Sequence, residues 1–167
     1  MAFRTISVIG LGYIGLPTAA IFAASGKNVI GVDVDHKVID IINRGEIHIA
    51  EPGLNVIVKE VVDCGKFKAL ETPVPSDAFL IAVPTPFYPI EAINDVPKPN
   101  LEYIKAAALS ISPVLKKGDL VVLESTSPVG TTEKLSEWLA NERSDLTFPQ
   151  THGEDSDIRI SHCPERV

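Results

Sequence analysis

Short hydrophobic runs alternate along the chain with longer segments in which apolar residues recur every three or four positions. The short runs, which predict strands, are residues 6–9, 29–33, 79–83, 120–123 and 158–161. The longer segments, which predict helices, are residues 14–25, 38–45, 54–65, 101–115 and 135–139, and Pro113 must kink or end the fourth. Apolar strands separated by helices are typical of a parallel sheet covered on both faces. We therefore predict an α/β fold, a doubly wound Rossmann-type parallel sheet with helices on both faces.

Two segments interrupt this alternation. Residues 84–100 are rich in proline and lack the periodicity of a helix or a strand. A loop of this length in a compact domain is either a lid or locally disordered. Residues 141–157 are mostly polar, and we expect them to be loosely structured.

Composition narrows the class of protein. With 167 residues, of which 45% are hydrophobic, the chain can form one domain with a sizeable core. The net charge is −7 and the basic residues form no stripe, which argues against nucleic-acid binding. An acidic domain can still bind an anionic cofactor, because helix N-termini and backbone N–H groups provide local positive potential.

The apolar run 14–24 lies near the N-terminus, so a signal peptide is an alternative to a helix. Glycines interrupt this run, Arg4 is the only charge before it, and it is too short to span a bilayer, so a buried helix is favoured. Cys64 and Cys163 lie too far apart for a disulfide framework or a metal-ligand motif. We expect a cytoplasmic protein with reduced thiols, no metal and no membrane contact.

Three glycines form a G-x-G-x-x-G motif between the first predicted strand and the first predicted helix. Gly10 permits a tight turn, Gly12 lets the backbone approach a pyrophosphate, and Gly15 lets the helix pack closely on the sheet. The N-terminus of the helix then faces the phosphates. The motif alone is weak, because a glycine turn can also be purely structural.

Asp33 strengthens the interpretation of the glycines as a dinucleotide site. It ends the second predicted strand, about 20 residues after the motif, where a carboxylate can accept hydrogen bonds from ribose hydroxyls. The same charge repels a 2′-phosphate, which favours NAD over NADP. Alternatively, Asp33 is a solvated helix cap, although Asp35 fits the capping role better.

Two loops that carry hydroxyl groups follow predicted strands, at the sheet edge where ligands bind in this fold. Val83–Pro86 contains Thr85, and Glu124–Gly130 contains Thr126. These hydroxyls can contact a dinucleotide or position a water, or they bond only to their own turns.

Polar residues also follow the last predicted strand. Glu165 and Arg166 suit a polar, anionic substrate, since a guanidinium binds phosphate or carboxylate well; alternatively, they form only a salt bridge. Cys163 precedes them, but nothing nearby in the sequence would activate it as a nucleophile.

Together these motifs closely resemble the N-terminal domain of the UDP-glucose/GDP-mannose dehydrogenase family over nearly the whole chain. The matching segments are Gly10–Pro17, Gly31–Asp33, Asn43–Gly45, Glu51–Pro52, Val83–Pro86, Ser125–Gly130 and Pro164–Glu165. Several segments, among them Ile47–Ile49, Glu124–Gly130 and Cys163–Val167, are most similar to the branch of the family that oxidises UDP-N-acetyl-D-mannosamine.

The resemblance implies a four-electron oxidation of a UDP-sugar at C6, through an aldehyde and a cysteine thioester, with two NAD molecules reduced in turn, in cell-surface polysaccharide synthesis. It implies that Glu165 acts during thioester hydrolysis and that Arg166 and Val167 touch the UDP-sugar. The expected NAD contacts, on the residues of this chain, are Gly10, Gly12, Tyr13, Ile14, Gly15, Asp33, Thr85 and Thr126.

The resemblance also places most of the active site beyond Val167. The family's catalytic lysine, asparagine and cysteine, its central helix and its UDP-binding C-terminal domain would all follow that residue. We therefore expect residues 1–167 to be an NAD-binding domain that is inactive alone, and the full-length enzyme to be a homodimer.

Three alternatives remain. The first is that the substrate is UDP-N-acetylglucosamine, UDP-glucose or GDP-mannose rather than UDP-N-acetyl-D-mannosamine. The second is that the chain is a non-catalytic NAD-binding module. The third, a hydroxyacid or hydroxyacyl dehydrogenase domain, is disfavoured by the segments Val83–Pro86 and Pro164–Glu165.

Overall fold

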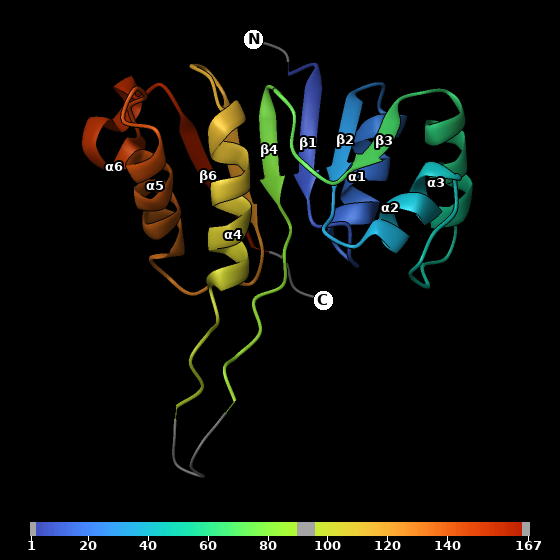
Figure 1. The fold of residues 1–167 in the computed structure, drawn as a ribbon, viewed down its shortest axis with the longest axis horizontal. Coiled ribbons are helices and arrows are strands. Elements are labelled where there is room, and N and C mark those ends of the chain that lie inside the picture. Colours follow the sequence, from blue (N-terminus) through green and yellow to red (C-terminus); the bar gives the residue numbers. More distant parts are fainter. Residues whose placement is uncertain (1–2, 90–95, 165–167) are drawn as a thin grey trace.

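The structure is a computed structural model that describes residues 3–89 and 96–164. Figure 1 shows its strands side by side, with helices grouped around each half of the sheet. The strands are β1 (Thr5–Ile9), β2 (Asn28–Val32), β3 (Phe67–Leu70), β4 (Ala78–Ile81), β5 (Leu120–Glu124) and β6 (Arg159–Cys163). The helices are α1 (Gly15–Ala24), α2 (His36–Asn43), α3 (Leu54–Asp63), α4 (Glu102–Ile111), α5 (Thr131–Glu142) and α6 (Pro149–His152), with 3₁₀ turns at Ser112–Val114 and Gly153–Asp155.

The strands form one parallel sheet in the order β3-β2-β1-β4-β5-β6. From the central pair β1 and β4, the chain builds outward to β3 in one direction and to β6 in the other. This reversal of direction is the switch point at which doubly wound sheets bind ligands. The predicted Rossmann-type fold is confirmed.

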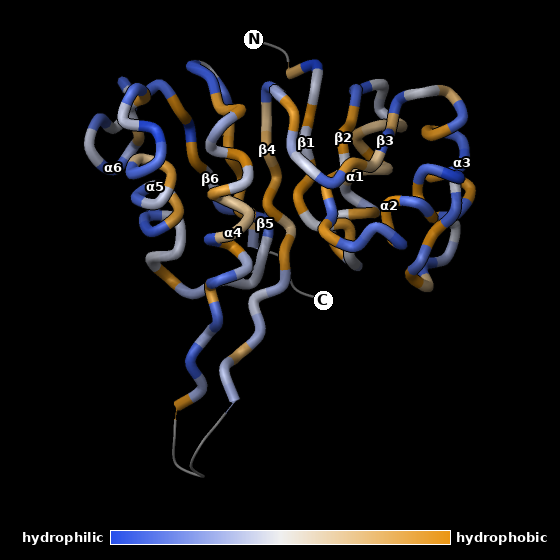
Figure 2. The backbone as a smooth tube through the Cα atoms, viewed as in Figure 1, coloured by the Kyte–Doolittle hydropathy of each residue, from blue (hydrophilic) through white to orange (hydrophobic). Residues whose placement is uncertain are grey.

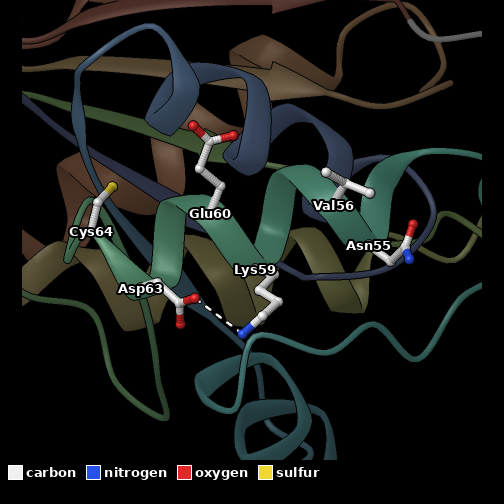
Figure 3. A pocket seen from close by; sticks show the side chains of 6 residues that line it. All are labelled: Asn55, Val56, Lys59, Glu60, Asp63 and Cys64. Carbon is white, nitrogen blue, oxygen red and sulfur yellow. Dashed lines mark hydrogen bonds and ion pairs between the residues drawn. The ribbon is translucent and has the colours of Figure 1, made fainter.

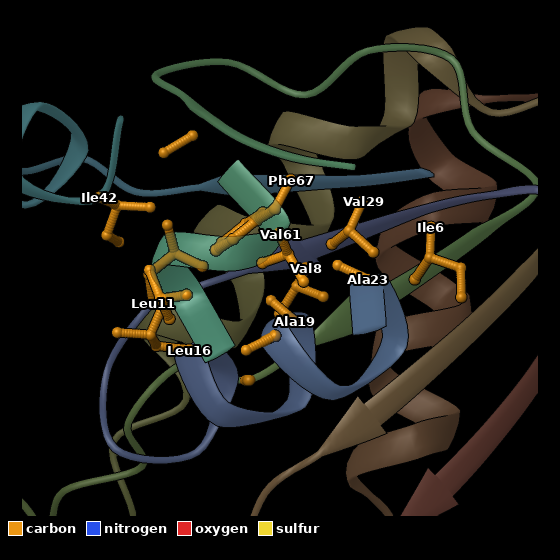
Figure 4. Packing of buried hydrophobic residues seen from close by; sticks show 14 of the residues in the cluster. Ile6, Val8, Leu11, Leu16, Ala19, Ala23, Val29, Ile42, Val61 and Phe67 are labelled. Carbon is orange, nitrogen blue, oxygen red and sulfur yellow. The ribbon is translucent and has the colours of Figure 1, made fainter. Parts of the chain in front are cut away.

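A hydrophobic core lies on each face of the sheet, because successive strand residues point to opposite sides. In β4, Ala78 and Leu80 join the core under α1 and α3, whereas Phe79 and Ile81 join the core under α4 and α5. Figure 4 shows the first core, and Figure 2 shows that hydrophobic residues are concentrated in the strands.

Two sequence-based expectations need correction. Strand β3 was not predicted, because Phe67–Leu70 is only four residues long and its Lys68 is exposed. The segment 141–157 was expected to be loose, but the Phe148 side chain is 1% exposed and the Arg143 guanidinium donates to the carbonyl oxygens of Ser112 and Leu115, both at 2.7 Å. By contrast, the predicted break at Pro113 is confirmed, since α4 ends at Ile111.

The described parts of the proline-rich loop, residues 84–89 and 96–100, pair as an antiparallel arm. The Tyr88 N–H donates to the Lys98 carbonyl at 2.8 Å, and the Asn100 N–H donates to the Pro86 carbonyl at 2.7 Å. Figure 1 shows the arm extending away from the sheet, beyond the carboxyl end of β4. Residues 90–95 lie outside the described part, so the choice between a lid and local disorder stays a prediction.

No helix within the described ranges is both long and apolar enough to cross a membrane.

Candidate functional site

The glycine turn between β1 and α1 has the geometry that the motif predicts. Gly10 has a φ of +92°, and a Cβ there would lie 2.7 Å from the Ala82 carbonyl oxygen. A Cβ on Gly15 would lie 1.8 Å from the Gly10 carbonyl oxygen, so only glycine allows α1 to begin so close to the turn. Gly12 differs, because a Cβ there would meet no atom within 4 Å. Its missing side chain therefore keeps space open for a ligand rather than relieving a clash.

Asp33 lies directly after β2 and holds the glycine turn in place. One carboxylate oxygen accepts the Leu11 N–H at 2.9 Å, and the other accepts the Asp35 N–H at 3.0 Å. The carboxylate also lines a cleft at the carboxyl edge of the sheet, as a ribose ligand requires. Asp35 caps α2 by accepting the Lys37 N–H at 2.8 Å, which confirms the role expected of it.

The two predicted hydroxyl loops meet above β4 and β5. The Thr85 hydroxyl donates to the Thr126 carbonyl oxygen at 3.2 Å, which joins residues far apart in the sequence. The alternative that each hydroxyl bonds only to its own turn is therefore wrong for Thr85.

Seven of the eight expected cofactor residues line two adjacent hollows, each of about 350 Å³, and Gly15 lines neither. The first lies between β1, β2 and α4 and includes Gly10, Asp33 and Tyr103 among its lining residues. The second lies above the glycine turn; the sequence-predicted residues that line it are Gly12, Tyr13, Ile14, Thr85 and Thr126. Val83 and Pro84 line both hollows, so the two lie next to each other at the switch point, and together we call them the cleft.

This cleft fits a dinucleotide. Its first part is largely apolar and is lined by two acidic residues, Asp33 and Glu71, which suits a flat base and a ribose. Its second part faces the N-terminus of α1, where none of the described side chains caps the helix. Uncapped N–H groups at a helix N-terminus bind phosphate oxygens. The space at Gly12 lets these groups be approached closely.

Glu124 and Ser125 also line the second hollow and were not among the individual site residues expected from the sequence. The Ser125 and Ser127 hydroxyls are buried and have no hydrogen-bond partner among the described residues. Glu124 accepts a hydrogen bond from the Thr18 hydroxyl at 3.2 Å, which connects β5 with α1. Because the contact links residues distant in the sequence, no local pattern could have predicted it.

The shifted pKa values lie away from this cleft. Asp77, just before β4, accepts the N–H groups of Thr5 and Arg4, and these bonds hold the pKa of its carboxyl below 3.8. Lys116 adds a smaller effect in the same direction. These groups join the amino ends of the strands, so their role is structural.

A wider hollow of about 630 Å³ runs along the outer side of α3. Figure 3 shows its polar side chains pointing outward, with an ion pair between Lys59 and Asp63 at 3.1 Å. Both side chains are more than 60% exposed. Such an exposed i,i+4 pair is typical of a solvated helix surface, so this hollow is not a candidate site.

The three residues expected at the substrate, Glu165, Arg166 and Val167, lie outside the described residues. Cys163, directly upstream at the end of β6, is exposed, as is Cys64. Within the described ranges, no cluster of histidine, cysteine and carboxylate side chains could hold a metal ion.

The sequence was compared with known proteins. Residues 4–167 match the model of the UDP-glucose/GDP-mannose dehydrogenase family, NAD binding domain. The chain is 61% identical over 167 residues to the UDP-N-acetyl-D-mannosamine dehydrogenase of Salmonella typhimurium, covering 100% of this chain and 38% of the relative. It is 59% identical over 165 residues to the NDP-N-acetyl-D-galactosaminuronic acid dehydrogenase of Ralstonia nicotianae, covering 99% of this chain and 38% of that protein. The chain thus spans less than half the length of these curated relatives.

Solved structures are similar over the same region. The UDP-N-acetyl-mannosamine dehydrogenase of Staphylococcus aureus superposes with a TM-score of 0.83 at 40% identity, over 98% of this chain and 37% of that one. The GDP-mannose dehydrogenase of Pseudomonas aeruginosa superposes with a TM-score of 0.81 at 28% identity, over 97% of this chain and 36% of that one.

Proposed function

Because the chain belongs to the UDP-glucose/GDP-mannose dehydrogenase family, of which it is the NAD-binding domain, we propose that it is the cofactor half of a nucleotide-sugar 6-dehydrogenase. The proposed substrate is UDP-N-acetyl-D-mannosamine, and the product is the corresponding uronate for cell-surface polysaccharide synthesis. The observation that carries this proposal is the pair of neighbouring hollows, of which Asp33 lines one and Gly12, Thr85 and Thr126 line the other. The identity of 61% to a UDP-N-acetyl-D-mannosamine dehydrogenase supports the choice of sugar.

Each part of the cleft has a proposed task toward NAD. Asp33 binds the adenosine ribose, and the backbone around Gly10, Gly12 and Gly15 binds the pyrophosphate at the start of α1. Tyr13, Ile14, Thr85 and Thr126 hold the nicotinamide half. NAD supplies a hydride acceptor at that end of the cleft.

The groups that oxidise the sugar are proposed to come from the last residues of this chain and from the part of the enzyme that follows them. Glu165 orients or activates water for thioester hydrolysis, and Arg166 and Val167 contact the UDP-sugar. The thiol that forms the thioester, the central helix and the UDP-binding domain belong to the part of the enzyme after residue 167. Two successive oxidations by two NAD molecules, and a homodimeric assembly, complete the proposal.

A second substrate is favoured by a specific observation. The relative that is 59% identical is named for NDP-N-acetyl-D-galactosaminuronic acid, a galactosamine derivative, rather than for N-acetylmannosamine. A 2-acetamido sugar is therefore the shared chemistry of the two candidates, and they differ in the stereochemistry of the ring.

The test is an assay of the complete protein encoded by the parent reading frame. NADH absorbance is followed with UDP-N-acetyl-D-mannosamine, UDP-N-acetylgalactosamine, UDP-N-acetylglucosamine, UDP-glucose and GDP-mannose in turn. We expect the highest kcat/KM with UDP-N-acetyl-D-mannosamine and two NADH formed per sugar consumed. NAD binding without NADH formation from any of these sugars would instead identify a non-catalytic NAD-binding module.

A further inference from the structure

An apolar groove of about 380 Å³ lies beside α1, on the opposite face of the sheet from α4 and α5. It begins between α1 and β4 and runs across β5 to β6. Its walls are mostly hydrophobic, and the residues used below are Ile21, Phe22, Leu80, Leu120, Val122 and Cys163.

The groove exists because one half of this sheet face has no helix over it. In β5, Val121 and Leu123 point toward α4 and α5 and are fully buried. Leu120 and Val122 point to the other face and are only partly buried. Parallel sheets are normally covered on both faces, since their strands are apolar on both sides. Among the described residues, α1, α2 and α3 pack mainly on the half formed by β1, β2 and β3, and α1 also contacts β5 where the Thr18 hydroxyl donates to Glu124 at 3.2 Å.

The polypeptide leaves the sheet at the rim of this groove. Cys163 is the last residue of β6, pairs in register with Glu124 of β5, and lines the groove. The curated relatives are longer than this chain, which covers 38% of them. A segment that continues from β6 is therefore already beside the uncovered surface.

We propose that the segment following residue 167 in the complete protein turns back over β5 and packs apolar side chains into this groove. The inference rests on the proposal that the chain is part of a longer enzyme. The connections β4-α4-β5 and β5-α5-β6 run outward and place their helices on the other face. A right-handed connection from β6 to a further strand beyond it would place its helix on the face of α4 and α5 again. Only a segment that turns back from β6 toward β4 covers the groove on the opposite face.

A tethered segment is favoured over a second copy of the chain. A segment attached within a few residues of Cys163 has an effective local concentration in the millimolar range. A second copy would need a comparable protein concentration to compete with it. Intramolecular packing therefore fills the groove in the complete enzyme.

The two cysteines give a direct test, because Cys64 and Cys163 are both exposed in the chain described here. Residues 1–167 and the complete protein are treated with a thiol reagent, and the peptides containing each cysteine are quantified by mass spectrometry. We expect both cysteines to react at similar rates in residues 1–167. In the complete protein, we expect Cys163 to react at least about tenfold more slowly than Cys64, because the segment packed in the groove must detach locally before the reagent can reach the Cys163 thiol. Equal rates in the complete protein would overturn the inference.

A substitution on the opposite wall of the groove gives an independent readout. Ile21 on α1 is 62% exposed and Val56 on α3 is 64% exposed, so Val56→Asp is a matched control for Ile21→Asp. We expect Ile21→Asp to lower the Tm of the complete protein by several degrees and to leave that of residues 1–167 nearly unchanged. Val56→Asp should change neither. Equal loss in both forms would show that no later segment covers the groove.

Two further outcomes separate this inference from its alternatives. If Cys163 of the complete protein becomes protected only as the protein concentration rises, and Ile21→Asp abolishes a dimer, then the groove is an interface between copies and the inference is wrong. A complete protein that oxidises nucleotide sugars while Cys163 reacts as fast as Cys64 would retain the proposed function and remove this inference alone.

Discussion

Asp33 combines a structural and a binding role in one side chain. Its carboxylate accepts N–H groups from Leu11 and Asp35 and also lines the cleft. These bonds fix the carboxylate at a defined position, so that its charge acts on whatever occupies the ribose end. A 2′-phosphate placed there would meet the negative charge of Asp33, and Glu71 lines the same hollow.

We therefore expect the chain to bind NAD at least about tenfold more tightly than NADP, a difference of about 1.4 kcal/mol. Asp33→Asn should narrow this ratio, because the amide carries no charge. Asp35→Asn is the matched control, since asparagine also caps helices well and Asp35 does not line the cleft. Titration calorimetry gives both affinities, and equal affinities in the unmodified chain would contradict the role proposed for Asp33.

Substitution by alanine should affect different properties at Gly12 and Gly15, namely NAD binding at Gly12 and stability at Gly15. A Cβ on Gly12 meets nothing within 4 Å, so Gly12→Ala should change stability by less than about 0.5 kcal/mol while abolishing NAD binding. A Cβ on Gly15 would lie 1.8 Å from a backbone oxygen, so Gly15→Ala should cost about 3 kcal/mol or more. Thermal unfolding and NAD titration separate the two effects. Retained NAD binding in Gly12→Ala would show that the phosphates lie elsewhere.

Glu165 can be tested only in the complete enzyme. If it serves thioester hydrolysis, Glu165→Gln should slow the last step and spare the first hydride transfer. A covalent sugar–enzyme adduct should then accumulate and be visible by intact-protein mass spectrometry. Normal turnover without an adduct would assign Glu165 a structural role, as a partner of Arg166.

At the scale of elements, prediction succeeded where a local pattern determines the structure. The glycine turn, Asp33 and the two hydroxyl loops were all located from strand ends and residue types. Strand β3 was missed because it is short and becomes a strand through its pairing with β2 rather than through a local sequence pattern. The ordering of residues 141–157 was missed for a similar reason, since Arg143 is fixed by carbonyl groups about 30 positions earlier. Contacts between distant segments leave no periodic signal in the sequence.

Strands β1 and β4 are joined at their amino ends by Asp77, whose carboxylate accepts the N–H groups of Arg4 and Thr5 at 2.8 and 3.0 Å. Its lowered pKa means that this contribution is present above pH 3.8 and is lost as the pH falls below that value. We expect Asp77→Asn to lower the free energy of unfolding by about 1 kcal/mol near neutral pH, because the site is partly exposed. The difference from the unmodified chain should shrink below pH 3.8.

The control is Asp63→Asn, which removes the exposed pair with Lys59 shown in Figure 3. Asp63→Asn should lower the free energy of unfolding by less than about 0.5 kcal/mol. Denaturant unfolding measured from acid to neutral pH gives both values. An effect of Asp77→Asn that does not vary with pH would contradict the assigned cause.

At the scale of the whole molecule, the described residues form a six-stranded parallel sheet and line the cleft at its carboxyl edge. We expect this chain to fold and to bind NAD more weakly than the complete enzyme, because a second domain would close over the nicotinamide end. It should form no NADH from UDP-N-acetyl-D-mannosamine, because a nucleophilic thiol must be held within about 3–3.5 Å of the reacting carbon. Absorbance of NADH tests this, and steady turnover lost in Cys163→Ser would refute it.

The strand order also determines when the domain can fold during its synthesis on the ribosome. Strand β1 emerges first, yet one of its two neighbours is β4, with Ile6 paired to Ala78 and Ile9 paired to Ile81. Until β4 has been synthesised, the nascent chain presents an open apolar strand edge at the future centre of the sheet. Such edges can pair with strands of other chains, so this interval is the one in which a nascent chain of this topology is most exposed to aggregation. The binding cleft is completed later still, when the loop after β5 follows, and α5 and β6 are synthesised only after that loop.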